Sequence, residues 1–305
     1  MKGIEWSENG YWDYVPEQAG LFLEQIAGDG YNRKHDWHYR TCTFEEFKNM
    51  HFDIFLASIF PNEFAMMRLR DNLSPDTKVI RQNGNPSETC FDNSCRNFIM
   101  TITPTDQYMI DLTKNLVEAK RNWCYVHQEF DMENHYKYTE PSNFKKINAY
   151  QNGLIYSSFH HLWLEMKELL PEFEFNMYGC LSDSGIGFDV ATELAGSMAD
   201  AGFIWQTKAN EDGGGFLSHN ALAVGRPLIC KKSNYGGVML DMLIDGETCI
   251  DLDARTMPEN AEFIRECSKP EKLAWMSKRC NEIYRQYVDF EKDAQIVNKF
   301  LKELQ

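Results

Sequence analysis

The chain has 305 residues, of which 43% are hydrophobic and 25% are charged, and its net charge is −15. This length suits two domains that each bury a core of their own. The acidity disfavours a protein that binds nucleic acid over its whole surface, and neither half of the chain is basic.

We expect neither a membrane span nor an export signal. Apolar runs such as 52–60 fall well short of the ~20 residues of a transmembrane helix, and the N-terminus has no apolar core before a cleavage site. The expected location is the cytoplasm, which would be the host cytoplasm for a viral protein. Nine scattered cysteines without a C-x-x-C pair indicate reduced thiols and no metal site.

The N-terminal half alternates between strand-like and helix-like segments. After a first helix over 15–27, apolar runs predict strands at 51–58, 78–81, 97–102 and 123–127, with helices at 44–50, 64–73 and 104–121. This alternation is typical of a parallel sheet with helices on its faces. We assign residues 1–140 to an N-terminal α/β domain.

Cations and aromatic rings alternate near the N-terminus. This cluster could hold phosphates and stack a base or sugar, or it could be a solvated loop with an aromatic anchor. Its candidate ligand-binding residues are Arg33, Lys34, Trp37 and Arg40.

The polar, non-periodic stretch 128–146 predicts a linker. A second α/β domain then spans 145–285, with strands expected at 146–156, 172–178, 202–207, 228–230 and 248–252. Ser157 or Ser158 is the expected cap of a helix that runs to 170. One long helix is expected over 270–304, and its end, 286–305, is expected to pack back on the N-terminal domain.

The stretch 211–230 predicts a loop, a helix and a strand. Gly213, Gly214 and Gly215 let the backbone approach a ligand, and good helix-forming residues follow from Ser218. The N–H groups at such a helix start suit a phosphate or diphosphate. Any αβ unit with a glycine-rich entry loop would share this pattern, so the spacing alone leaves both interpretations open.

These residues resemble a known family. Asp212-Gly-Gly-Gly-Phe-Leu-Ser-His-Asn-Ala-Leu-Ala-Val-Gly-Arg-Pro227 is similar to the donor-site signature of retaining glycosyltransferases with the GT-B fold. The resemblance extends back to 173–179 and forward to 245–252, and it is weak over the N-terminal half. It implies two facing Rossmann-like domains, a cleft between them and transfer with retention of configuration. No tightly bound cofactor is expected, and a nucleotide sugar, most simply a UDP-sugar, is the expected co-substrate.

The resemblance implies roles for matching positions. Asp212 stands where the family's first acidic residue contacts the transferred sugar, with Glu211 beside it, and His127 at a strand end is a further catalytic candidate. Asn220 stands where a second acidic residue usually holds the ribose, so the chain departs from the pattern there. Arg226 and Lys208 are the substitutes for cations that the family places elsewhere. The full donor-binding set is Lys208, Gly213, Gly214, Gly215, Phe216, Ser218, His219, Asn220, Tyr178 and Gly179.

Other motifs favour ordinary structural interpretations. Asp251-Leu-Asp253 matches a manganese-binding pattern by chance more readily than by function. His160 and His161 lie within a predicted helix, where a structural role is favoured over catalysis.

Three functions stay open at this point. A glycosyltransferase acting on a saccharide or a modified DNA base comes first. A non-catalytic nucleotide or sugar-phosphate binding protein is the alternative, because Asn220 replaces an acid. An α/β sugar epimerase would share the fold without needing an acceptor.

Overall fold

In a computed structural model of the chain, the described residues are 5–6, 12–13, 24–27, 37–40, 53–58, 75–83, 97–100, 120–127, 136–151, 154–179, 191–207 and 216–304. The chain forms two compact units. The first comprises residues 1–102, 112–126 and 292–305, and the second comprises residues 103–111 and 127–291.

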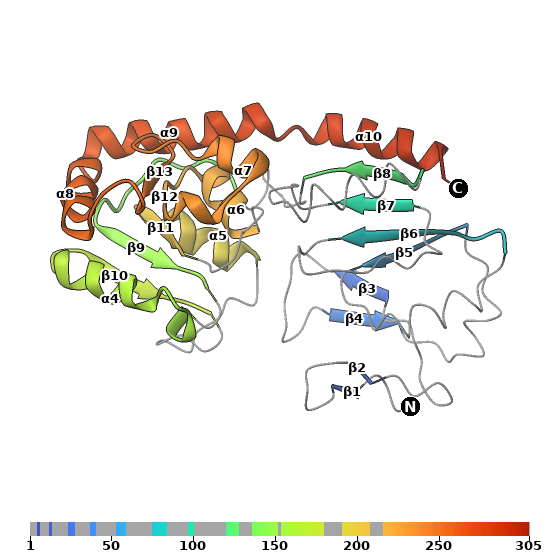
Figure 1. Cartoon of the computed structure of the whole chain (residues 1–305), viewed down its shortest axis with the longest axis horizontal. Helices are drawn as coiled ribbons and strands as arrows, with labels where there is room; N and C mark the ends of the chain where they lie inside the picture. The colour runs from blue at the N-terminus through green and yellow to red at the C-terminus, as the bar shows by residue number, and fades with distance from the viewer. Residues whose placement is uncertain are drawn as a thin grey trace. The chain divides into compact units, whose positions relative to one another are not determined.

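The first unit contains a four-stranded parallel sheet in the order β5-β6-β7-β8 (Figure 1). Its strands are β5 (Ile54–Ser58), β6 (Lys78–Asn83), β7 (Asn97–Met100) and β8 (Asn122–Tyr125). The four strands expected from apolar runs are therefore confirmed. The helices expected at 44–50, 64–73 and 104–121 lie outside the described residues.

Two antiparallel pairs precede this sheet. They join β1 (Glu5–Trp6) to β2 (Trp12–Asp13) and β3 (Glu24–Ala27) to β4 (Trp37–Arg40). The helix expected over 15–27 is wrong in its last four residues, which form β3. The partner strand contains the aromatic residues Trp37 and Tyr39, which favour strand formation and cross-strand pairing.

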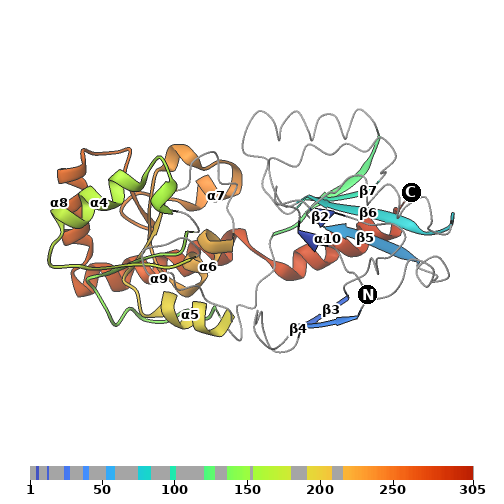
Figure 2. The same ribbon diagram turned by 90° about the horizontal axis from the view of Figure 1, so that it is seen from below.

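The C-terminal helix packs within the first unit. Phe300 of α10 (Phe290–Lys302) joins Ile80 and Cys124 of the sheet in one buried cluster, and Figure 2 shows α10 alongside these strands. Asn122 Nδ2 lies 3.1 Å from the Glu303 carbonyl and 3.4 Å from the Phe300 carbonyl. Asn122 therefore donates to carbonyls that the helix end leaves unpaired.

The prediction of one long helix over 270–304 is wrong, because this region forms two helices. α9 (Pro270–Tyr287) ends before Val288, which is extended at φ −110° and ψ 113° and is buried. An extended, β-branched residue with a buried side chain interrupts the helical repeat, and α10 begins two residues later.

The second unit is built on a five-stranded parallel sheet in the order β10-β9-β11-β12-β13. Its strands are β9 (Lys146–Ala149), β10 (Glu174–Met177), β11 (Phe203–Gln206), β12 (Leu228–Cys230) and β13 (Cys249–Asp251). Its helical segments are η1 (Leu154–Tyr156), α4 (His160–Leu169), α5 (Ala191–Ala199), α6 (Phe216–Val224), η2 (Lys232–Asn234), α7 (Gly237–Met242), α8 (Met257–Cys267) and α9. The expected α/β alternation is confirmed.

The start of α4 differs from the expected serine cap. Phe159 occupies the cap position without a side-chain hydrogen bond, and the Ser157 hydroxyl accepts from the Phe159 N–H at 3.2 Å instead. The serine therefore shapes the turn before the helix rather than capping the helix itself.

Alternating side chains of each strand supply two separate cores. Trp205 and Ile229 pack with α4 and α8 on one face, whereas Ile204 and Leu228 pack with α5, α6, α7 and α9 on the other. Strands buried on both faces read as continuous apolar runs, which is why β11 and β12 are evident in the sequence.

The strand order creates a switch point. The chain goes from β9 to β10 through α4 on one face, and from β11 to β12 through α6 on the other face. Since β9 and β11 are neighbours, the loops that leave their carboxyl ends diverge to opposite faces. In open α/β sheets of this order a ligand crevice lies at that point.

Gly225 ends α6 in a conformation that needs glycine. Its φ is +86°, and an added Cβ would lie 2.8 Å from the Ser277 carbonyl oxygen and 2.8 Å from Tyr138. We expect Gly225→Ala to lower the free energy of unfolding by about 1–3 kcal/mol, because the left-handed backbone is strained and the backbone contact cannot yield. Urea unfolding measures this.

Gly196 provides the control. It lies exposed in α5, and an added Cβ would meet nothing within 4 Å. Gly196→Ala should raise stability by about 0.5–1 kcal/mol. Equal effects of the two substitutions would contradict the assignment of Gly225 as the residue that ends α6.

Candidate functional site

Helix α6 presents its N-terminus at the switch point. The chain leaves β11 at Gln206 and Thr207, both buried, and α6 begins at Phe216. The expectation that a helix starts directly after the three glycines is therefore confirmed. Because helices run back along a parallel sheet, this N-terminus lies at the carboxyl edge of the strands.

Several candidates lie outside the described residues. These are Lys208, Glu211, Asp212, Gly213, Gly214 and Gly215 of the donor loop, together with Arg33 and Lys34. For Phe216, Trp37 and Arg40 the structure gives the backbone element alone, which is α6 for Phe216 and β4 for the other two.

The three polar candidates of α6 are buried. Ser218, His219 and Asn220 are 0%, 3% and 3% exposed. The Ser218 hydroxyl lies 3.4 Å from the Tyr235 hydroxyl, and the His219 ring meets Tyr284 of α9 edge to face, with ring centroids 6.0 Å apart. Among the described residues, Asn220 Oδ1 has no hydrogen-bond partner, which is unusual for a buried acceptor.

His127 lies beside α6. Its ring centroid is 6.5 Å from that of His219, with the rings tilted by 52°. The structure thus brings two candidates together, one from the end of the β8 segment and one from the donor helix. His160 and His161 lie in the first turn of α4, where His161 Nδ1 is 2.9 Å from the Ser158 carbonyl oxygen.

Arg226 is a structural residue, and its expected role as a phosphate contact is wrong. Its side chain is completely buried and burial lowers its pKa to about 10, so it stays charged at neutral pH. Its two terminal nitrogens donate to acceptors from four parts of the fold. The closest are the Ala199 carbonyl at 2.6 Å, the Thr139 carbonyl and hydroxyl at 2.8 Å each, the Gly225 carbonyl at 3.0 Å and the Ser277 hydroxyl at 3.2 Å.

These contacts fasten residues 136–140 to the C-terminal end of α6. The Thr139 N–H also donates to the Val224 carbonyl at 3.2 Å, and Tyr136 is buried in the core around α6. His127 and residues 136–140 therefore both lie against α6.

Tyr178 and Gly179 follow the carboxyl end of β10. The Tyr178 ring stacks on Tyr150, with centroids 5.3 Å apart and planes inclined by 14°. Gly179 has a φ of +122°, which favours glycine. Sequence reasoning missed Tyr150, because its position opposite Tyr178 depends on the register of β9 and β10.

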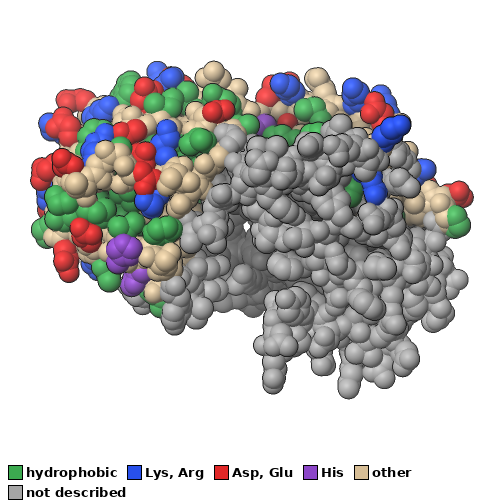
Figure 3. All heavy atoms as spheres, viewed as in Figure 1, with side chains coloured by type: hydrophobic (Ala, Val, Ile, Leu, Met, Phe, Trp, Pro, Cys, Tyr) green, Lys and Arg blue, Asp and Glu red, His purple; other side chains and the backbone are tan. Residues whose placement is uncertain are grey.

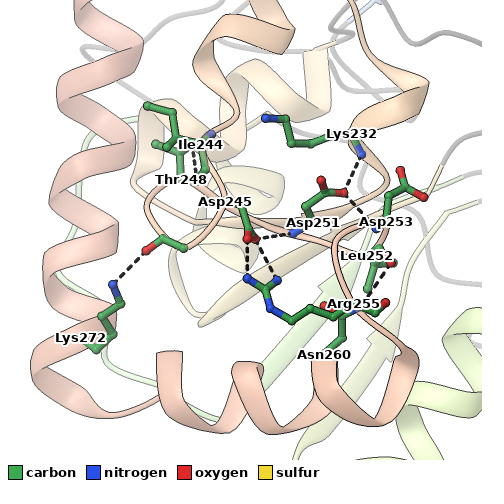
Figure 4. A network of polar contacts seen from close by, with 11 residues as sticks. Lys232, Ile244, Asp245, Thr248, Asp251, Leu252, Asp253, Arg255, Asn260 and Lys272 are labelled. Atoms are coloured by element: carbon green, nitrogen blue, oxygen red, sulfur yellow. Dashed lines mark hydrogen bonds and ion pairs between the residues drawn. The ribbon is translucent and has the colours of Figure 1, made fainter.

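A polar network shapes the edge beyond β12 and β13 (Figure 4). Asp245 accepts the Asp251 N–H at 2.9 Å and forms an ion pair with Arg255. Asp251 in turn accepts the N–H groups of Lys232 at 3.1 Å and Asp253 at 3.0 Å. These bonds fix the turns that follow both strands.

Asp253 binds two side chains that follow β12. It pairs with Lys231 and accepts from the Ser233 hydroxyl at 2.7 Å. Partial burial acts to raise the pKa of Asp253, but the hydrogen bonds from Lys231 and Ser233 hold that pKa below its ordinary value. Within the described part of the chain, no group of three or more His, Cys, Asp or Glu side chains is arranged to hold a metal.

The described surface of the second unit carries acidic and basic side chains interspersed in the view of Figure 3. Among the described residues, no helix has the length and apolar character that a membrane crossing needs.

No protein-family model matches the sequence, and no curated protein matches it significantly. Solved structures do match. HepE from Anabaena, in complex with UDP and glucose, has a TM-score of 0.59 at 14% identity over 85% of this chain and 80% of its own. A TarM from S. aureus, in complex with fondaparinux, α-GlcNAc-glycerol and UDP, has a TM-score of 0.59 at 14% identity over 80% of this chain and 55% of its own.

An α-glucosyltransferase in complex with UDP and a 13-mer DNA containing a HMU base has a TM-score of 0.56 at 14% identity, over 81% of this chain and 80% of its own. The chain shares the fold of these glycosyltransferases. The GT-B fold implied by the donor loop is thereby confirmed.

The structural role of Arg226 is testable. We expect Arg226→Lys to lower the free energy of unfolding by about 2–4 kcal/mol, because an ammonium group cannot replace the planar fork and leaves buried carbonyls unpaired. Urea denaturation measures the loss.

Arg285→Lys is the control, since Arg285 is exposed on α9, where its Nε donates to Asn281 Oδ1 at 3.1 Å. Its effect should stay within about 0.5 kcal/mol. A stable Arg226→Lys protein with weakened binding of UDP would contradict the structural assignment and restore Arg226 as a phosphate contact.

Proposed function

We propose that the protein is a glycosyltransferase that moves a sugar from a UDP-sugar to an acceptor. The observation that carries this proposal is the position of the helix start that follows the three glycines in the sequence. Residues 213–215 lead directly into the N-terminus of α6 at the switch point of the sheet. Structures of the same fold hold UDP, and this helix start has the chemistry that binds a diphosphate.

The leaving diphosphate sets the main electrostatic demand of such a transfer. The N–H groups at the start of α6, together with Lys208, which precedes this helix in the sequence, would offset the negative charge that develops on the diphosphate. The glycines allow the backbone to approach the phosphates closely. This arrangement needs no metal ion, and UDP-sugar serves as a co-substrate rather than as a resident cofactor.

Asp212 is the proposed contact to the transferred sugar, with Glu211 as its neighbour. His127, which lies beside His219 on the donor helix, is the proposed further catalytic residue at the sugar. We propose a retaining outcome because the donor loop resembles that of retaining enzymes, and the anomeric configuration of the product, read by proton NMR, decides it.

The acceptor is a glycan or a modified DNA base. Neighbours of this fold include an enzyme bound to DNA as well as enzymes bound to saccharides. Arg33, Lys34, Trp37 and Arg40 are the proposed acceptor-binding residues, since cations and aromatic rings together suit either phosphates or sugar rings. Transfer to hydroxymethylated DNA that survives replacement of Arg33, Lys34 and Arg40 by Ala would remove these residues from the proposal.

Donor binding and turnover test the proposal together. UDP should raise the melting temperature of the purified protein by mass action, and a UDP-sugar should be consumed when acceptors are supplied. Asp212→Asn should lower the transfer rate by about 100-fold or more while UDP still raises the melting temperature, because a group at the reacting sugar acts on the transition state.

Asp241→Asn is the matched control, since Asp241 is exposed on α7 and should leave turnover unchanged. Absence of any shift with UDP would refute the donor site. Conversion of the sugar without any acceptor would indicate an epimerase.

A non-catalytic binding protein is the second candidate. Asn220 favours it, because an amide replaces the acid that the resemblance places at the ribose. Asn220 Oδ1, which has no partner within the described part of the chain, can nonetheless accept a hydrogen bond from a ribose hydroxyl. Measurable UDP binding without hydrolysis or transfer of any UDP-sugar would favour this candidate.

The Asn220 contact has its own test. Asn220→Ala should weaken the binding of UDP about tenfold, because a hydrogen bond to the ribose is lost. Calorimetric titration with UDP measures the affinity.

Asn281→Ala is the control, because Asn281 lies on α9 and contacts the C-terminal end of α6. Asn281 Nδ2 donates to the Ala223 carbonyl at 2.6 Å, so this variant should lose about 1 kcal/mol of stability and keep its affinity for UDP. Equal UDP affinity in wild type and Asn220→Ala would exclude Asn220 from the site.

A further inference from the structure

A ladder of polar pairs lines one face of β9 and β10. Every second residue of β9 lies beside a residue of β10 on the side of the sheet that α5 covers. From the amino end to the carboxyl edge, these pairs change from charged to amide to aromatic. The pairs are Lys146 with Glu174 (3.4 Å), Asn148 with Asn176 (3.1 Å) and Tyr150 with Tyr178 (ring centroids 5.3 Å apart). At the carboxyl edge of β9 and β10, this row of pairs ends in two stacked aromatic rings.

The Tyr150 hydroxyl is held on two sides. It accepts from Asn148 Nδ2 at 2.9 Å and lies 2.8 Å from the Ser197 hydroxyl of α5. Asn148 is itself completely buried and also donates to the Ser197 carbonyl at 3.1 Å. Burial raises the pKa of Tyr150, so the ring stays neutral. These contacts fix the plane of the ring.

Tyr178 lies nearly parallel to that fixed plane. Its N–H donates to the Ala149 carbonyl at 2.8 Å, which continues the strand pairing one residue beyond β10. Gly179 then turns the chain with a φ of +122°. Tyr178 is partly exposed, and it therefore offers an aromatic surface at the carboxyl edge, on the same face as α6.

Resting on the proposed function, we propose that Tyr178 stacks on the nucleobase of the donor and that Tyr150 is the positioning residue for its ring. The proposed diphosphate site is the start of α6, which follows β11, and β10 lies two strand spacings from β11, or about 10 Å. A ribose bridges such a gap between phosphates and base. The base and the transferred sugar are attached to opposite ends of the diphosphate. Because His127, the proposed catalytic residue at the sugar, lies beside His219 of α6, we place the base at the other end, at Tyr178 on the β10 side.

Comparison of UDP with inorganic pyrophosphate tests this proposal, because only UDP carries a base. Tyr178→Leu should weaken the binding of UDP about tenfold in calorimetric titration, whereas Tyr178→Phe should stay within about twofold of wild type. Both variants should bind pyrophosphate as wild type does. Tyr150→Phe keeps its ring but loses both hydrogen bonds, so it should weaken UDP by a smaller factor and again leave pyrophosphate unchanged.

The base-specific loss separates the proposed role from a merely structural one, which would weaken UDP and pyrophosphate alike. Equal UDP affinity in wild type and Tyr178→Leu would overturn the proposal, and so would a raised KM for the acceptor alone. If Tyr178→Leu does not fold, Tyr178→His carries the same comparison with a smaller ring. If the wild-type protein binds pyrophosphate as tightly as UDP, the base contributes no affinity and the proposal is overturned. If it binds neither ligand, the donor site itself is refuted.

Discussion

A single buried guanidinium connects the parts of the fold on which the candidate site depends. Arg226 joins the end of α6 to the segment at Thr139, to α5 through the Ala199 carbonyl and to α9 through Ser277. Burying a charge is costly, and the surrounding acceptors offset that cost only when all of them are in place. The position of α6, and so of its N-terminus, is therefore set by a contact at its far end.

The strand order of the second sheet positions the other parts of the candidate site. Because β9 lies between β10 and β11, loops that are distant in sequence leave the same edge of the sheet. The start of α6 and the paired tyrosines follow different strands and lie on one face of the sheet at this edge. The other face is closed by the packing of α4 and α8 around Trp163 and Trp205, which gives the edge a rigid support.

Local patterns were enough to predict the strands of both parallel sheets and the helix start after the glycines. Buried strands such as Phe203–Gln206 are evident from their continuous apolar residues. Long-range pairing was not predictable: the partners of Arg226 lie 27, 51 and 87 positions away, so its inward direction has no local signal. The break at Val288 was missed for a related reason, since tertiary burial of that side chain overrides the helical propensity around it.

The charged end of the β9 and β10 ladder has a consequence for association. β10 is an edge strand, and its outer backbone groups would otherwise offer a template to a strand of another molecule. It is four residues long, and its first residue, Glu174, is exposed and ion-paired with Lys146, which also pairs with Asp200. A short edge with charges at its start resists the addition of a further strand, so the same ladder that ends in stacked rings also protects the sheet from edge-to-edge aggregation.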